Sequence, residues 1–210
     1  MPEPTVTTAP IRLGVHGSPQ LATGIVRAAG HDERTVRLVP YDVADPFHAL
    51  RAGETDVMIV KYGLREPDLA VGGPVGHDPR AVLVGAHHPL AERREVSLEE
   101  LAAYDAFHCP GSFPEYVWDK VVPRRTPSGR PIRRTHHMGS VEQLMALLAG
   151  TDAIHISFRS LEHIAPPAVR VIPVRDLPPA PVALAWLRDP APSPELAAFI
   201  TAAEAGSATR

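Results

Sequence analysis

The spacing of apolar residues predicts an alternation of strands and helices at the start of the chain. Strand patterns occupy residues 11–15, 35–39 and 56–60, and helical patterns occupy residues 18–30 and 45–53. The third strand pattern, DVMIV, is a continuous apolar run of the kind that parallel sheets bury on both faces. The order strand, helix, strand, helix, strand predicts an α/β fold with right-handed crossovers.

The rest of the chain continues the alternation after a loop over residues 61–68. Strands are expected over residues 81–85, 105–109, 133–137, 153–157, 169–174 and 182–187, and helices over residues 97–103, 112–122, 140–150 and 193–206. No solenoid repeat or low-complexity segment interrupts these elements. An α/β fold is therefore expected along the whole chain, with residues 1–10 and 207–210 as flexible tails.

Three of the predicted helices begin with a Gly-Ser pair. The pairs are Gly17–Ser18, Gly111–Ser112 and Gly139–Ser140. Glycine lets a ligand approach the backbone, and serine is a good N-cap whose hydroxyl can also reach a ligand. Helix N-termini attract anions, so three that converge predict an anion-binding site.

Composition excludes several classes of function. The formal net charge of −3 provides no field that would draw the 210-residue chain to nucleic acid or anionic lipid. The single cysteine, Cys109, allows no internal disulfide and favours a reducing, cytoplasmic location. The N-terminus lacks the pattern of a secretory signal, and no run approaches the ~20 apolar residues of a membrane span.

Several stretches, taken in order, resemble the effector-binding domain of LysR-type transcriptional regulators, a two-lobed fold similar to type 2 periplasmic binding proteins. These stretches are 49–56 (ALRAGETD), 82–91 (VLVGAHHPLA), 96–101 (VSLEEL), 139–149 (GSVEQLMALLA), 153–157 (AIHIS), 181–188 (PVALAWLR) and 193–196 (SPEL). No one stretch is diagnostic, but together they extend over nearly all of residues 11–205.

The resemblance implies two α/β lobes, built of mixed sheets flanked by helices, with a small-molecule cleft between them. Lobe I would comprise residues 11–80 and 188–206, and lobe II residues 87–181, with connecting strands at 81–86 and 182–187. Family members pair such domains side by side, which implies a homodimer. The family's winged helix-turn-helix has no counterpart here, so we expect either a free-standing domain or part of a longer regulator. No direct contact with nucleic acid or membrane is expected, and no cofactor.

The cleft that the resemblance implies gives the candidate ligand-binding residues, which follow strands or open helices. They are His16, Gly17, Ser18, Lys61, Tyr62, His108, Ser112, Phe113, His136, Met138, Gly139, Ser140, His155, Ser157 and Phe158. Lys61 would pair with an anion, because ligands of open α/β sheets lie beyond the carboxyl ends of strands. Phe113 and Met138 would wall an apolar pocket. The expected function is the binding of a small organic anion.

An enzyme on the same scaffold is the alternative. His16, Lys61, His136 and His155 have the acid–base chemistry of a lyase, isomerase or cyclase. However, no nucleophile motif is present. A metal site is not expected either, because His136 and His137 are adjacent on an extended segment and point to opposite faces.

Overall fold

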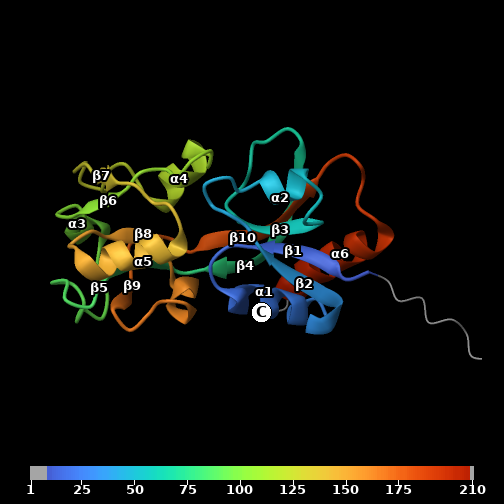
Figure 1. Cartoon of the computed structure of the whole chain (residues 1–210), viewed down its shortest axis with the longest axis horizontal. Helices are drawn as coiled ribbons and strands as arrows, with labels where there is room; N and C mark the ends of the chain where they lie inside the picture. Colours follow the sequence, from blue (N-terminus) through green and yellow to red (C-terminus); the bar gives the residue numbers. More distant parts are fainter. Residues whose placement is uncertain (1–8, 209–210) are drawn as a thin grey trace, which may run out of the picture.

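Two groups of elements lie side by side along the long axis of the molecule (Figure 1). The computed structural model describes residues 9–208. The predicted tails at 1–8 and 209–210 lie outside the described residues, whereas residues 207–208 belong to the last helix. The two-lobed α/β fold that the resemblance implies is confirmed.

The first lobe is built on a five-stranded mixed sheet in the order β2-β1-β3-β10-β4. Its strands are β1 (Ile11–Val15), β2 (Val36–Pro40), β3 (Val57–Lys61), β4 (Leu69–Asp78) and β10 (Ala180–Leu187). The first three strands are parallel, as the crossover pattern predicts, and β10 runs antiparallel to β3 and β4. The helices of this lobe are α1 (Pro19–Ala28), η1 (Glu33–Thr35), α2 (His48–Arg51) and α6 (Pro194–Ala208).

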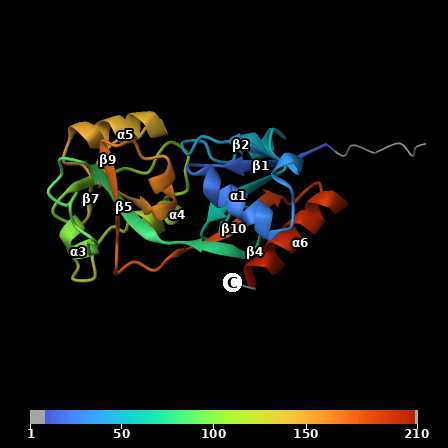
Figure 2. The ribbon, with the colours of Figure 1, turned by 90° about the horizontal axis from the view of Figure 1, so that it is seen from below.

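Successive side chains of strand β3 pack into two apolar layers, one on each face of the first sheet. Val57 and Ile59 of β3 pack with α1 and α6 on one face, whereas Met58 and Val60 pack with α2 on the other. Because successive strand residues point to opposite faces, a continuous apolar run is what a sheet covered on both sides requires. Figure 2 shows α1 and α6 together on their face of the sheet.

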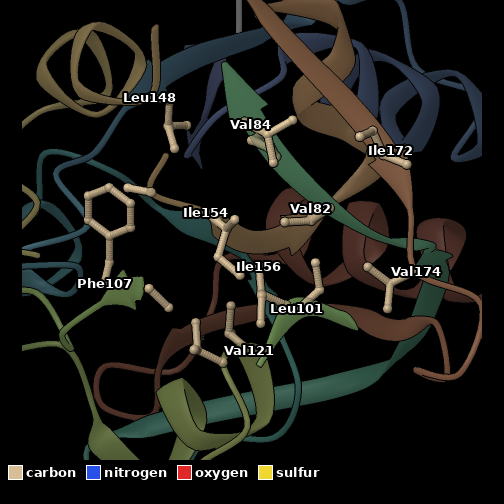
Figure 3. Packing of buried hydrophobic residues seen from close by; sticks show 14 of the residues in the cluster. Val82, Val84, Leu101, Phe107, Val121, Leu148, Ile154, Ile156, Ile172 and Val174 are labelled. Atoms are coloured by element: carbon tan, nitrogen blue, oxygen red, sulfur yellow. The ribbon is translucent and has the colours of Figure 1, made fainter. Parts of the chain in front are cut away.

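The second lobe is built on a three-stranded antiparallel sheet in the order β8-β5-β9, with a two-stranded parallel ladder, β6-β7, beside it. The strands are β5 (Arg80–Gly85), β6 (Asp105–Phe107), β7 (Arg133–His136), β8 (His155–Phe158) and β9 (Val169–Pro173). The helices are α3 (Leu98–Leu101), α4 (Glu115–Val121), α5 (Val141–Gly150) and η2 (Arg159–His163). Their apolar side chains form one continuous core, in which Phe107, Ile154 and Leu148 are fully buried (Figure 3).

The junction between the lobes falls at two points in the chain. Pro79 alone separates β4 from β5, and residues 174–179 separate β9 from β10. Strand β5 is the centre of the second sheet, and β10 lies wholly in the first sheet, so each strand begins at the junction. The lobe boundaries given above stay a prediction.

Candidate functional site

An enclosed cavity of about 100 Å³ lies between the two sheets. The first lobe contributes the residues after β1 and β2, the residue pair before α2, and strand β3. The second lobe contributes α4, α5, β8 and η2. The lining residues are His16, Tyr41, Val43, Pro46, Phe47, Met58, Ile59, Val60, Lys61, Leu64, Phe113, Pro114, Val117, Trp118, Val121, Met138, Val141, Leu144, Met145, His155, Ser157, Phe158 and Leu161. Most of this lining is carbon, so the few polar side chains determine what can bind.

Lys61 is the cation in the wall of the cavity. It is the last residue of β3, and its side chain is only 17% exposed. Its Nζ lies 3.1 Å from Oδ2 of Asp78 and 4.2 Å from the ring centroid of Phe158. Burial lowers the pKa of Lys61, and the neighbouring Asp78 carboxylate opposes that shift. The ammonium is therefore held at one end of an apolar chamber.

A second cation, Arg80, lies behind that end of the cavity and links the lobes. Its Nε donates to the Ser157 carbonyl at 3.0 Å, and its Nη1 donates to Tyr62 Oη at 2.8 Å and to the Lys120 carbonyl at 3.0 Å. Its Nη2 donates to the carbonyl of Val121. Burial lowers the pKa of Arg80, with opposing effects from Tyr62 and Asp78. The guanidinium thereby fixes the end of α4 against β8 and the first lobe.

Two imidazoles face the cavity from opposite lobes. His16 Nδ1 lies 3.4 Å from the Tyr41 carbonyl, and burial lowers the pKa of His16. His155 is 4% exposed, and burial lowers its pKa to about 3, with smaller electrostatic effects of His16 and Arg80 in the same direction. Among the described residues, the buried Nδ1 of His155 has no hydrogen-bond partner. Burial therefore favours the neutral form of both rings, and His155 offers the unused Nδ1 at the cavity wall.

The structure brings together about half of the residues predicted from sequence. His16, Lys61, Phe113, Met138, His155, Ser157 and Phe158 line the cavity. Gly17, Ser18, Tyr62, His108, Ser112, His136, Gly139 and Ser140 do not. Three of the four residues of the enzyme alternative therefore share the cavity, whereas His136 packs its ring 5.6 Å from that of Phe107. Which of these residues bind a ligand stays a prediction.

The prediction of three serine-capped helices was wrong for two of them. Ser18 occupies the N-cap of α1, but its hydroxyl donates to Gln20 Oε1 at 2.8 Å and caps no backbone N–H. Ser112 lies outside α4, because Pro114 is the N-cap, and its hydroxyl donates to the Ala44 carbonyl at 3.1 Å. Ser140 does form the predicted capping box with Gln143. None of the three serines lines the cavity, so Lys61 is the better candidate for anion recognition.

Sequence reasoning missed Tyr41, Asp78 and Arg80. Tyr41 lines the cavity and donates its hydroxyl to the Ile59 carbonyl at 3.1 Å. Asp78 and Arg80 are both nearly fully buried, and Asp78 Oδ1 accepts from the Ser160 N–H at 3.1 Å. The available signal was the order acid, proline, base directly before an apolar strand. Charged residues beside a buried strand are usually paired, because charges are rarely buried without a partner.

Cys109 is predicted to be chemically inert. Its Sγ lies 3.1 Å from the Phe113 carbonyl, and burial raises the pKa of the thiol to about 11. Because the thiolate is the nucleophile, we expect its reaction with 5,5′-dithiobis(2-nitrobenzoate) at pH 7.5 to be roughly 100-fold slower than that of an ordinary thiol. Urea should restore the ordinary rate, and equal rates in native and unfolded protein would contradict the prediction.

Within residues 9–208, no three histidine, cysteine, aspartate or glutamate side chains gather closely enough to hold a metal ion. No helix in that range combines the length and the hydropathy that a bilayer span requires.

Comparison with known proteins identifies the family. The family model of the LysR substrate binding domain matches residues 12–207. The effector-binding domain of QuiR, solved in complex with shikimate, is similar over 97% of this chain and 99% of that chain, with 18% identity and a TM-score of 0.67. The LysR family transcriptional regulator CbnR is similar over 93% of this chain and 68% of that chain, with 17% identity and a TM-score of 0.70.

The regulatory domain of CcmR from Synechocystis PCC6803, solved in complex with 2-PG, is similar over 95% of this chain and 98% of that chain, with 18% identity and a TM-score of 0.63. At these identities the structures show the fold that the chains share. No curated protein matches the chain. The family match covers nearly the whole sequence, and the chain belongs to the LysR substrate-binding domain family.

Proposed function

We propose that this domain senses a small organic anion, which it holds in the cavity between its two lobes. The cavity of about 100 Å³ is enclosed by both lobes and is lined mainly by carbon. An apolar cavity of ~150 Å³ can hold benzene, so this smaller one suits an acid group and the first few carbons of a ligand. The similar domains of QuiR and CcmR were solved with small molecules, shikimate and 2-PG.

The charge balance at one end of the cavity is the observation that carries the proposal. The half-buried Lys61 pairs with the buried carboxylate of Asp78, and the buried Arg80 interacts electrostatically with the same carboxylate, so two cations share one anion. A buried charge without a partner is costly, and a bound carboxylate would offset the surplus positive charge. The unpartnered Nδ1 of His155 offers a second contact, to a hydroxyl or N–H of the ligand.

Binding would favour one relative arrangement of the lobes over others, because the cavity wall comes from both lobes. We place lobe I at residues 11–80 and 188–206 and lobe II at residues 87–181. By family, the readout would be transcription regulation in the cytoplasm by a homodimer. Light scattering of the purified domain measures its oligomeric state directly.

Replacing Lys61 with methionine tests the proposed recognition. With butanoate and pentanoate as probes in calorimetry, we expect the variant to bind at least tenfold more weakly, because hydrogen bonds to charged groups contribute about 1.5–3 kcal/mol. Methionine keeps much of the side-chain volume. Parent protein that binds neither probe, or a Lys61→Met variant with an unchanged Kd, would refute the proposal.

Lys120→Met is the matched control. Lys120 is the other lysine of the chain, is exposed on α4 and does not line the cavity. Its replacement removes the same charge from the surface and should leave both dissociation constants within about twofold of the parent, since surface charges contribute little.

A further inference from the structure

A second hollow adjoins the cavity and shares part of its wall. This outer groove has a volume of about 750 Å³ and is lined by β1 and β2 of the first lobe and by α5 and the residues after η2 of the second. Four residues, His16, Tyr41, Val141 and Met145, line both the cavity and the outer groove. These four side chains form the partition between a small enclosed chamber and a larger open one.

The two hollows differ in polarity. The cavity is lined by Lys61, Ser157 and His155, none of which lines the outer groove. The outer groove is lined largely by aliphatic side chains and prolines, and among its described lining residues Glu142 carries a formal charge. The cavity therefore holds the positive charge of Lys61, whereas the outer groove is apolar and carries the negative charge of Glu142.

We infer that the ligand of this domain is an elongated amphiphilic monocarboxylate, with its acid group at Lys61 and an apolar tail that passes the shared partition into the outer groove. This inference rests on the proposed function and names the chemical class of its ligand. The outer groove adjoins the cavity at four common lining residues, and this adjacency makes the tail of the same ligand the occupant that we propose.

Volume and charge both support an elongated monoacid. A cavity of about 100 Å³ is smaller than the ~150 Å³ that holds benzene, so a chain of more than a few carbons extends beyond it. The side walls that would receive the extension, Leu38 and Pro40 on β2 and Ala146 and Ala149 on α5, are apolar. A second carboxylate at the far end of the ligand would meet Glu142, and like charges repel.

A series of straight-chain carboxylates from butanoate to decanoate, kept below their micellar concentrations, tests the inference by calorimetry. The affinity should rise about three- to fourfold for each added methylene up to octanoate, because each carbon that leaves water contributes to binding. Lys61→Met should weaken every member of the series by a similar factor.

A bulky side chain in the outer groove distinguishes binding of the ligand's tail from binding of its acid group. Ala146 is exposed on α5 and lines only the outer groove, so Ala146→Trp should weaken octanoate at least tenfold and leave butanoate within twofold. Ala198→Trp is the matched control, because Ala198 is exposed on α6 and lines neither hollow. It should leave the whole series unchanged.

The possible results distinguish the proposed function from the elongated ligand. If butanoate binds through Lys61 but affinity is flat beyond pentanoate, the proposed function stands and the elongated ligand is refuted. If Ala146→Trp weakens all chain lengths equally, or changes the oligomeric state in light scattering without a chain-length effect, the groove holds no ligand tail. If no carboxylate binds, both the proposed function and this inference fail.

Discussion

Replacing Arg80 with alanine is expected to lower the free energy of unfolding by about 3–5 kcal/mol, as the loss of one partner from a buried charged network does. Arg80 is 4% exposed, and its guanidinium bonds the carbonyls of Ser157, Lys120 and Val121 as well as the hydroxyl of Tyr62. Alanine leaves these groups buried without a donor and opens a void at the junction of the lobes.

Urea unfolding followed by circular dichroism measures this loss. Arg37→Ala serves as the matched control, because Arg37 is exposed on β2 and its replacement should change stability by no more than about 0.5 kcal/mol. Arg80→Lys should recover only part of the loss, since an ammonium cannot span the four acceptors that the planar guanidinium reaches. An Arg80→Ala variant as stable as Arg37→Ala would show that the network contributes nothing.

The pattern of the sequence was sufficient to predict the first parallel strands, because local and tertiary requirements agree there. Strand β3 is apolar at every position from Val57 to Val60, and the structure buries all four side chains, two on each face. Similarly, the capping boxes at Ser97 and Ser140 satisfy their own backbone groups and therefore require no tertiary partner.

Strand β4 was not predicted, because its local sequence contradicts its place in the sheet. Residues 72–74 are Gly-Gly-Pro, which normally ends a strand. The strand forms because it lies at the edge of its sheet, where β10 pairs with it through two register shifts that accommodate the irregular segment. Pairing with a partner more than 100 residues away is not visible in a local pattern.

The cavity residues that lie at strand ends could be predicted from the sequence. Lys61, His155, Ser157 and Phe158 lie at or near strand ends, which the α/β pattern brings to one region. Ser18 and Ser112 were assigned by their motifs alone, but Ser18 Oγ turns to Gln20 and Ser112 Oγ to Ala44, and α4 begins only after Pro114. Local motifs do not reveal such competing partners.

The stability of the domain is expected to fall as the pH falls from 7 to 5, and His155 should account for a large part of the loss. Its folded-state pKa is about 3, whereas an ordinary histidine titrates near 6.5. Below pH 6.5 His155 is therefore protonated in the unfolded chain but not in the native state. This difference favours unfolding by about 1.4 kcal/mol per pH unit. At pH 5 this amounts to about 2 kcal/mol.

Urea unfolding of the parent and of His155→Gln at pH 7, 6 and 5 isolates this contribution. Glutamine carries no titrating group. The free energy of unfolding of the parent should therefore fall by about 2 kcal/mol relative to that of His155→Gln as the pH falls from 7 to 5. His77→Gln, at an exposed position on β4, is the matched control and should retain the parent's pH dependence. His16 lines the same cavity, and burial lowers its pKa as well, so its contribution has the same sign and remains in both proteins of the pair. Parallel curves for the parent and His155→Gln would mean that the imidazole accepts a proton in the folded protein, and the cavity would then gain positive charge in acid.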